Sequence, residues 1–165
     1  MILIIDFGSQ FNQLIARRVR ECQVYCQIEP PHISVHAIRK LNPQGIILSG
    51  GPSSIYAQNS PKIDKAIFDL GLPVLGICYG MQFMIATLGG TVNKARKREY
   101  GFAELRIKKE TGLFKGLPAN TVCWMSHGDS ITKLPRGFQS TATTDNTNYA
   151  ATANPRKRLY GVQFH

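Results

Sequence analysis

The sequence lacks any apolar stretch long enough to cross a bilayer. Its N-terminal run, MILIIDFG, is also too short for a signal peptide, has no basic segment before it and reaches Asp6 at once. Only four cysteines occur in 165 residues, which is too few for a disulfide-stapled scaffold. No internal repeat or low-complexity segment is present. We therefore expect one cytoplasmic globular domain, spanning residues 1–165, with reduced thiols.

Acidic residues are scarce, which leaves the chain strongly basic. Ten Asp and Glu stand against twenty Lys and Arg, a formal net charge of +10, and basic residues gather at 94–98 and 156–158. Because no helix-turn-helix, zinc-finger or RNA-binding signature surrounds either run, we expect solvated faces or a protein interface rather than a nucleic-acid site. The pair Cys22 and Cys26 has no matching second pair of Cys or His with the spacing of a structural zinc site, so no metal site is predicted.

Apolar runs alternate with helical spacings up to Gly90. Strands are expected at 2–6, 24–28, 45–52 and 72–78, and helices at 10–20, 35–41, 61–70 and 79–88. After Gly90 the segments are shorter and read as strands: GTVNKA, FAELRI, TVCWMS, QSTATT, YAATA and LYGVQF. The pattern predicts an α/β fold with an open, mostly parallel sheet flanked by helices and additional, largely antiparallel strands in the C-terminal half.

The segment GICYG places Cys78 between the last strand and the last helix of that first half. Ligands of open α/β sheets bind beyond the carboxyl ends of the strands. G-x-C-x-G resembles G-x-S-x-G, in which a nucleophile occupies a tight, strained turn, and Gly76 and Gly80 provide the room for it. We expect the positive end of the helix to lower the pKa of Cys78. A small buried thiol without function is the competing interpretation, and the motif alone does not decide.

A thiol nucleophile also needs backbone donors and a base. The N–H of Tyr79, at the helix start, is placed to point at a developing oxyanion, and the N–H of Gly51 in the turn SGGP is the candidate second donor. Among four histidines, His165 follows the strand-like YGVQF, which would carry it to the same sheet edge as Cys78. His127 lies in WMSHGD, which we expect to be a polar turn after an apolar strand.

Six segments together resemble one family: DFGSQ (6–10), ILSGGP (47–52), GICYGMQ (76–82), REYGFAEL (98–105), WMSHGD (124–129) and GVQFH (161–165). They are similar to the class I glutamine amidotransferase domain, in particular the domain that serves GMP synthetases. GxCxG with the terminal GxxFH points to class I amidotransferases. DFGSQ and MSHGD point to the GMP synthetase group within them.

This resemblance implies hydrolysis of L-glutamine. Cys78 would attack the side-chain amide to give a γ-glutamyl thioester, and His165 would carry the thiol proton to the leaving ammonia. The N–H groups of Gly51 and Tyr79 would form the oxyanion hole, each worth about 3–4 kcal/mol. The residues that surround the backbone end of glutamine in relatives correspond here to Gln82, Ser126, Gly128 and Asp129. The Asp129 carboxylate would suit the substrate's ammonium, although MSHGD also fits an ordinary hairpin turn.

The family places Pro-Glu directly after this histidine, and the glutamate orients the imidazole. The sequence ends at His165, so we expect it to be part of a longer protein. Relatives of the GMP synthetase group continue into an ATP-pyrophosphatase domain that adenylates XMP and receives the ammonia. The resemblance implies that the glutaminase domain needs no cofactor, that ATP and Mg²⁺ serve the synthetase domain or subunit, and that glutaminase activity is weak without it. The two basic runs, with REYG, would face that partner.

Two other functions are compatible with the residues. A cysteine hydrolase of γ-glutamyl compounds would share GxCxG but would not require DFGSQ or MSHGD. A catalytically silent subunit would keep the fold and use its basic face to bind a partner or nucleic acid, and the presence of both Cys78 and His165 argues against it.

Overall fold

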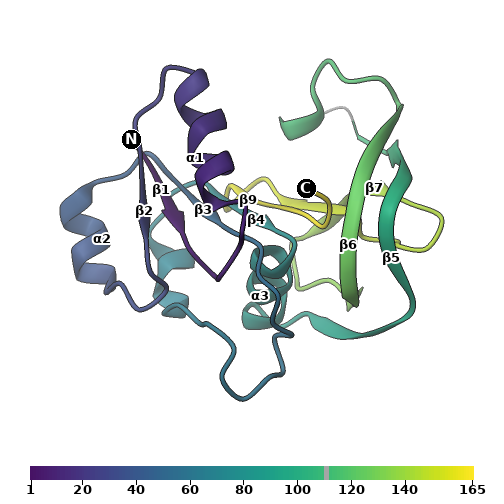
Figure 1. The fold of residues 1–165 in the computed structure, drawn as a ribbon, viewed down its shortest axis with the longest axis horizontal. Coiled ribbons are helices and arrows are strands. Elements are labelled where there is room, and N and C mark those ends of the chain that lie inside the picture. The colour runs from purple at the N-terminus through teal and green to yellow at the C-terminus, as the bar shows by residue number, and fades with distance from the viewer. Residues whose placement is uncertain (110–111) are drawn as a thin grey trace.

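The computed structural model describes residues 1–109 and 112–165, apart from the side chains of 96–98. Its strands form a single nine-stranded sheet in the order β2-β1-β3-β4-β9-β8-β7-β5-β6 (Figure 1). Five neighbouring strands are parallel: β2 (Cys26–Glu29), β1 (Ile2–Ile5), β3 (Gly45–Leu48), β4 (Val74–Ile77) and β9 (Leu159–Val162). The predicted parallel half is therefore confirmed, and it recruits β9 from the other end of the chain.

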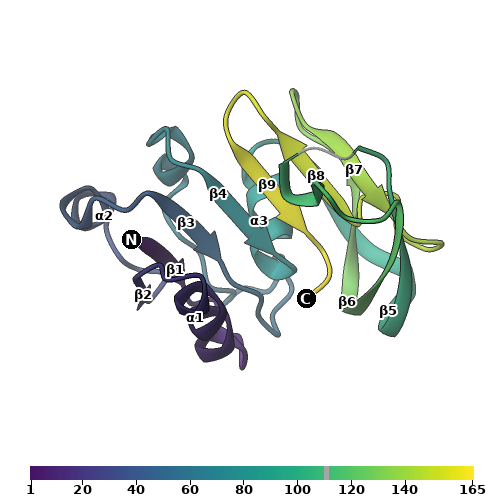
Figure 2. The ribbon, with the colours of Figure 1, turned by 90° about the horizontal axis from the view of Figure 1, so that it is seen from above.

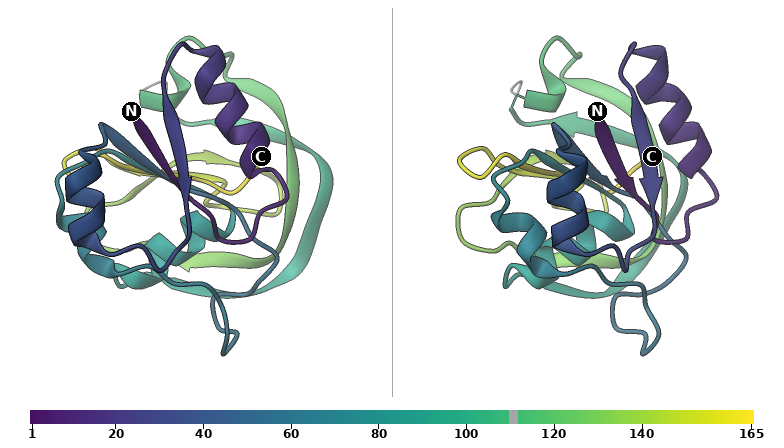
Figure 3. Two further views of the ribbon diagram at one scale, coloured as in Figure 1. Left: turned by 60° about the vertical axis from the view of Figure 1, so that its left-hand side comes forward. Right: turned by 90° about the vertical axis from the view of Figure 1, so that its left-hand side faces the viewer.

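The remaining strands pair in antiparallel fashion, as predicted. They are β5 (Thr91–Ile107), β6 (Asn120–Lys133), β7 (Gln139–Thr143) and β8 (Ala151–Asn154). GTVNKA and FAELRI belong to one long strand, β5, whose register shifts between Lys94 and Glu99. A short 3₁₀ helix, η2 (Gly112–Phe114), lies between β5 and β6. Figure 3 shows the β5–β6 ribbon curving along one side of the molecule.

Helices cover both faces of the parallel strands. The α-helices are α1 (Asn12–Glu21), α2 (Val35–Leu41) and α3 (Tyr79–Thr87). Helix α1 packs through Ala16 on Ile4 and Cys26, whereas α2 and α3 share the core of the opposite face, around Ile38 and Phe83. Seen from above, α1 and α3 lie on opposite sides of the sheet (Figure 2). Among the described residues, no helix is both long and apolar enough to span a membrane.

The helix predicted at 61–70 is wrong in type and length. Only a 3₁₀ helix, η1 (Lys65–Asp69), forms there. Asp64 has extended backbone and accepts a hydrogen bond from the N–H of Ala66, so the helix begins after it. Gly71 follows with φ of 69°, a left-handed conformation that ends the helix. Six residues, 65–70, lie between these two signals, which leaves room for a short helix only.

Candidate active site

Cys78 lies at the junction of β4 and α3 in a strained turn. Its backbone angles are φ 51° and ψ −108°, a conformation that L residues rarely adopt. A Cβ at Gly76 would lie 2.7 Å from the N and Cα atoms of Met81, and a Cβ at Gly80 would lie 2.3 Å from the Leu48 carbonyl oxygen. Only glycine fits at either position. The strained turn that GxCxG predicts is confirmed, together with the reason for its two glycines.

The glycine turn after β3 lies beside this thiol. A Cβ at Gly50 would be 3.6 Å from the Cβ of Cys78. Ser49 fixes the turn, because its carbonyl accepts from the N–H of Gly80 at 3.1 Å and its hydroxyl accepts from the N–H of Phe7 at 2.9 Å. The N–H of Gly51 has no hydrogen-bond acceptor within residues 1–109 and 112–165. Of the two candidate oxyanion donors, Gly51 follows Gly50 beyond the end of β3, and Tyr79 follows Cys78 beyond the end of the adjacent strand β4.

The thiol itself is closed in, with Cys78 only 6% exposed. Its Sγ donates to the main-chain carbonyl of Ser126 on β6 at 3.6 Å. Burial raises the pKa of Cys78 to about 11, although hydrogen bonds from the N–H of Tyr79 and the side chain of Gln163 act in the opposite direction. The prediction of a lowered pKa was therefore wrong. The helix start does contribute as expected, but the loss of water around the thiolate outweighs it.

The MSHGD segment is part of a strand, so the polar turn predicted there from the sequence is wrong. Residues 124–129 lie inside β6 and pair with β5, with Ser126 opposite Tyr100 and His127 opposite Glu99. A turn was expected because Gly-Asp is common turn chemistry. Here β5 supplies strand partners for residues 124–127 and for Asp129. The extended strand brings the Ser126 carbonyl to the Cys78 thiol and the Asp129 carbonyl to Gln82, and it carries Gly128 between them.

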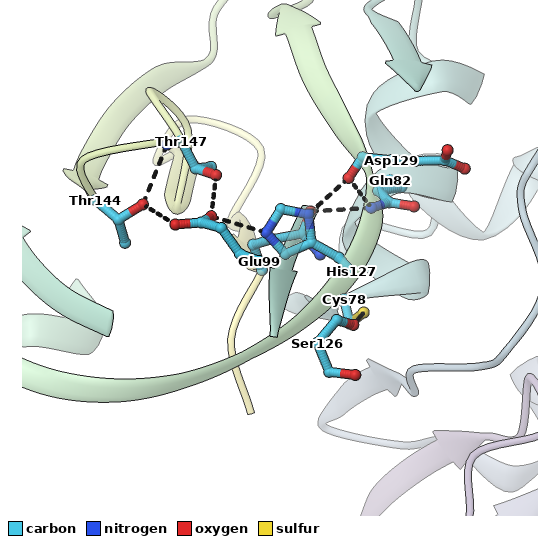
Figure 4. A network of polar contacts seen from close by, with 9 residues as sticks. Cys78, Gln82, Glu99, Ser126, His127, Asp129, Thr144 and Thr147 are labelled. Carbon is cyan, nitrogen blue, oxygen red and sulfur yellow. Dashed lines mark hydrogen bonds and ion pairs between the residues drawn. The ribbon is translucent and has the colours of Figure 1, made fainter. Parts of the chain in front are cut away.

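A buried ion pair holds this part of β6. The His127 ring contacts the Glu99 carboxylate through Nε2 at 3.0 Å and the Asp129 carbonyl through Nδ1 at 2.8 Å (Figure 4). Both side chains are almost completely buried. Glu99 also accepts from the hydroxyls of Thr144, at 2.8 Å, and Thr147. Both ring nitrogens of His127 therefore face acceptors, and the Glu99 carboxylate faces three possible donors.

Hydrogen bonds keep the Glu99 carboxylate charged. Burial alone would raise the pKa of Glu99, but the donors Thr147, Thr144 and His127 outweigh it and lower the pKa below its usual value. The ion pair therefore fixes the Asp129 carbonyl from one side.

Gln82 holds the same carbonyl from the other side. It lies in the first turn of α3 and is 4% exposed. Its Nε2 donates to the Asp129 carbonyl at 3.1 Å and to Oε1 of Gln163 at 3.0 Å. The carboxylate of Asp129 points away from His127 in Figure 4 and forms no ion pair with any residue in the described ranges.

His165 reaches the predicted sheet edge. Strand β9 pairs with β4, and the N–H of Cys78 donates to the Val162 carbonyl at 2.8 Å. The His165 ring packs against Phe11 with ring centroids 5.8 Å apart, and no hydrogen bond joins it to the thiol within the described part of the chain. Burial and the charge of His127 lower the pKa of His165, which favours the neutral imidazole.

A buried thiol in a strained strand-to-helix turn, with a histidine at the same sheet edge, is the arrangement of a thiol acyl-transfer enzyme. Residues 3–165 match the model of the family described as glutamine amidotransferase class-I. The chain belongs to the class I glutamine amidotransferases. It is 56% identical over 164 residues to the glutamine-hydrolysing GMP synthase of Heliobacterium modesticaldum and 52% identical over 164 residues to that of Brachyspira hyodysenteriae. In both cases 99% of this chain and 32% of the relative are covered, so the chain spans about a third of the length of these relatives.

Solved structures agree with this family. A Thermoplasma acidophilum protein assigned as a GMP synthase subunit superposes with a TM-score of 0.88 at 29% identity, over 99% of this chain and 82% of that one. A glutamine amidotransferase of Thermotoga maritima gives a TM-score of 0.81 at 20% identity, over 99% and 74% of the two chains. The second comparison supports the fold alone.

Sequence reasoning missed two buried polar residues of this candidate site, Glu99 and Gln163. Both lie in motifs that carry the resemblance, REYGFAEL and GVQFH, but neither residue type has a fixed spacing to Cys78 that would mark it. The sequence placed Glu99 within an exposed contact region, whereas it is 7% exposed and paired with His127. A polar residue inside an apolar strand pattern was the available signal.

The basic run 156–158, together with Cys22 and Cys26, lies apart from this site, whereas Lys94 of the other basic run pairs with Asp129. The side chains of Arg96, Lys97 and Arg98 are outside the described residues. Residues 156–158 precede β9 and therefore lie at the sheet edge opposite to Cys78, as the loop between β8 and β9 shows in Figure 2. Cys22 is exposed, and buried Cys26 donates to the Ala16 carbonyl. No cluster of three His, Cys, Asp or Glu side chains that could hold a metal occurs among the described residues.

Proposed function

We propose that this chain is a glutaminase domain that hydrolyses L-glutamine through a Cys78 thioester and supplies ammonia for the conversion of XMP to GMP. The conformation of Cys78 carries the proposal. A non-glycine residue at φ 51° costs of order 1–3 kcal/mol and persists where the surrounding structure enforces it, as Gly76 and Gly80 do here. Membership of the amidotransferase family and the identity to glutamine-hydrolysing GMP synthases support the substrate.

The chemistry follows from the groups around the thiol. Sγ of Cys78 attacks the amide carbon of the glutamine side chain, and its proton passes to the neutral imidazole of His165. The negative charge that develops on the amide oxygen is stabilised by the N–H groups of Tyr79 and Gly51. His165 returns the proton to the leaving nitrogen, which departs as ammonia. Water then attacks the thioester, releasing glutamate and restoring the thiol.

The backbone end of glutamine is assigned to the β6 segment and α3. Gln82 uses its Nε2 within the protein, while its Oε1 accepts no hydrogen bond from a described residue and is available to the substrate's ammonium. The carboxylate of Asp129, which has no ion-pair partner among the described side chains, offers a second acceptor for that ammonium. We assign the substrate carboxylate to the neighbourhood of Ser126 and Gly128. Glutamine bound in this way would place its amide next to Cys78, since Sγ already contacts the Ser126 carbonyl.

The rest of the protein is proposed to bind over an apolar patch on the β5–β6 ribbon. Four large side chains on one face of the ribbon are 58–67% exposed: Tyr100, Phe102, Val122 and Trp124. Phe102 pairs with Trp124, and Tyr100 pairs with Ser126, the residue that contacts the Cys78 thiol. We propose that the synthetase portion, which would bind ATP, Mg²⁺ and XMP, covers this patch. This chain spans only about a third of its relatives, so most of their length remains to supply that portion.

The first experiment is intact-mass analysis after incubation with a glutamine-mimicking diazo ketone. We expect one adduct on Cys78, absent from Cys78→Ala and prevented by excess L-glutamine. Protection by γ-glutamyl peptides but not by glutamine would indicate the alternative γ-glutamyl hydrolase. A correctly folded protein that forms no adduct, with or without a loaded synthetase portion, would contradict the proposal.

A further inference from the structure

Gln163 is the one buried polar side chain beside Cys78, within the described residues, that the proposed chemistry leaves without a role. It follows β9 directly, is 1% exposed, and its own N–H donates to the Ala150 carbonyl at 2.8 Å. Because the N–H of Cys78 donates to the carbonyl of the preceding residue, Val162, the two side chains leave neighbouring stretches of backbone. Gln163 is therefore held rigidly at the nucleophile.

The orientation of its amide group follows from a chain of hydrogen bonds. The Asp129 carbonyl can only accept, so the atom of Gln82 that faces it must be the NH₂ group. That NH₂ group also faces Gln163, and the facing atom of Gln163 must then be the oxygen. The NH₂ group of Gln163 is left on the other side, buried and without an oxygen or nitrogen acceptor among the described residues.

An unpaired buried NH₂ group is costly, commonly about 1–3 kcal/mol. This group makes no geometrically complete hydrogen bond to a described residue in the resting site, yet it lies near enough to the Cys78 sulfur to lower the pKa of that thiol against the effect of burial. The resting thiol donates its proton to the Ser126 carbonyl and presents little negative charge to a donor. A thiolate would present a full charge.

We infer that Gln163 is a further catalytic residue, whose NH₂ group hydrogen-bonds the Cys78 thiolate as the thiol loses its proton. The interaction is weak in the ground state and strong when charge develops on sulfur, which is the difference that accelerates a reaction. This role rests on the proposed function, because that function makes Cys78 the nucleophile. Gln82 is then a positioning residue for Gln163 as well as a substrate contact.

The test measures thiolate formation without glutamine. Cys78 is alkylated with iodoacetamide across a range of pH, and its rate is followed peptide by peptide alongside exposed Cys22. Gln163→Met keeps the volume and removes the NH₂ group. We expect the rate–pH curve of Cys78 to shift to higher pH by about one to two pH units, with the rate at pH 8 falling roughly threefold to tenfold, because the more basic thiolate is also more nucleophilic.

The controls separate this role from a structural one. Cys22 should react unchanged, and so should Cys78 in Gln139→Met, which makes the same change at a distant half-buried glutamine on β7. Gln163→Glu keeps an oxygen acceptor for Gln82 and should shift the rate–pH curve of Cys78 still further to higher pH. This variant serves as the test if Gln163→Met does not fold. If the rate–pH curve of Cys78 does not shift in a folded Gln163 variant, Gln163 does not stabilise the thiolate and the inference is overturned. Because no glutamine is used, that result would leave the proposed function standing.

Discussion

The thiol of Cys78 and the main-chain carbonyl of Ser126 are joined by a hydrogen bond of 3.6 Å, although 48 residues separate them in the chain. The bond joins the strained turn after β4 to strand β6, and burial of the sulfur between them favours its protonated form. The proposed nucleophile is therefore at rest: the thiol is buried, its pKa is raised to about 11, and its proton is directed at a carbonyl instead of a base. A substrate that occupies this space must displace that contact.

The resting thiol should be unreactive in spite of its position. With a pKa of about 11, only about one Cys78 in a thousand is a thiolate at pH 8. We expect iodoacetamide to modify exposed Cys22 at least tenfold faster than Cys78 at that pH, and the Cys78 rate to keep rising with pH up to about 11. Peptide-level mass spectrometry measures both sites in one sample. A Cys78 that reacts faster than Cys22 at neutral pH would show that the helix start outweighs burial.

The turn around Cys78 should tolerate no side chain at Gly80. An alanine Cβ there would lie 2.3 Å from the Leu48 carbonyl oxygen. Because the carbonyl is part of the backbone and the Cβ is fixed to the backbone, neither can move aside easily. We expect Gly80→Ala to lower the free energy of unfolding by about 2–4 kcal/mol. Gly50→Ala is the matched control, because its Cβ would lie at an ordinary 3.6 Å from Cys78 and should change stability by less than about 1 kcal/mol. Urea denaturation measures both, and equal losses would refute the steric explanation.

Glu99→Gln should destabilise the protein in a pH-dependent manner. The folded state lowers the pKa of Glu99, so its contribution is complete above the usual glutamate pKa and is lost as pH falls through the folded value. At pH 7 we expect a loss of about 1–3 kcal/mol, since the amide leaves His127 without a charged partner. The difference in the free energy of unfolding between Glu99→Gln and the wild type should disappear at acid pH. Exposed Glu104, on the same strand, supplies the control Glu104→Gln, and a gap independent of pH would contradict the assignment.

Local patterns predicted four of the five parallel strands because each of these buried strands has its own apolar run, whereas the parallel pairing of β9 with β4 has no local signal. They also predicted the thiol at the strand end, since two glycines around one cysteine are typical of a nucleophile turn. The turn expected at MSHGD failed for a tertiary reason: pairing with β5 decides whether Gly-Asp bends or stays extended. The pKa of Cys78 failed similarly, because a helix start is visible in sequence but burial by β6 is not.

Glu99 and Gln163 show a second limit of sequence reasoning. Each acquires its role from a partner far along the chain, His127 for Glu99 and Gln82 for Gln163. Sequence separations of 28 and 81 residues carry no periodic signal. The sheet order, which inserts β9 beside β4, creates the second pair.

The apolar patch should matter for communication with the synthetase portion and not for the glutaminase site itself. We expect Trp124→Ser to reduce the stimulation of glutamine hydrolysis by ATP and XMP at least tenfold, because its exposed ring would be buried in that contact. Labelling of Cys78 by the diazo ketone should change little. Leu14→Ser, a similarly apolar position on α1 that is 45% exposed, is the control. Unchanged stimulation in Trp124→Ser, measured in the whole protein, would remove the patch from the interface.

The charge on His127 should set the acid limit of activity through His165. Burial lowers the pKa of His165 first, and the positive charge of His127 lowers it further, so the imidazole remains neutral and able to accept the thiol proton down to a lower pH. In His127→Gln that charge is gone while burial remains. The pKa of His165 should rise, and the acid limb of the kcat/KM profile for glutamine should move to higher pH.

Thr147→Val, which removes a donor to Glu99 but keeps the His127 side chain, should leave the acid limb in place. If both variants showed the wild-type limb, the charge of His127 would have no influence on the base; if both moved it equally, the buried network would act through structure and not through charge.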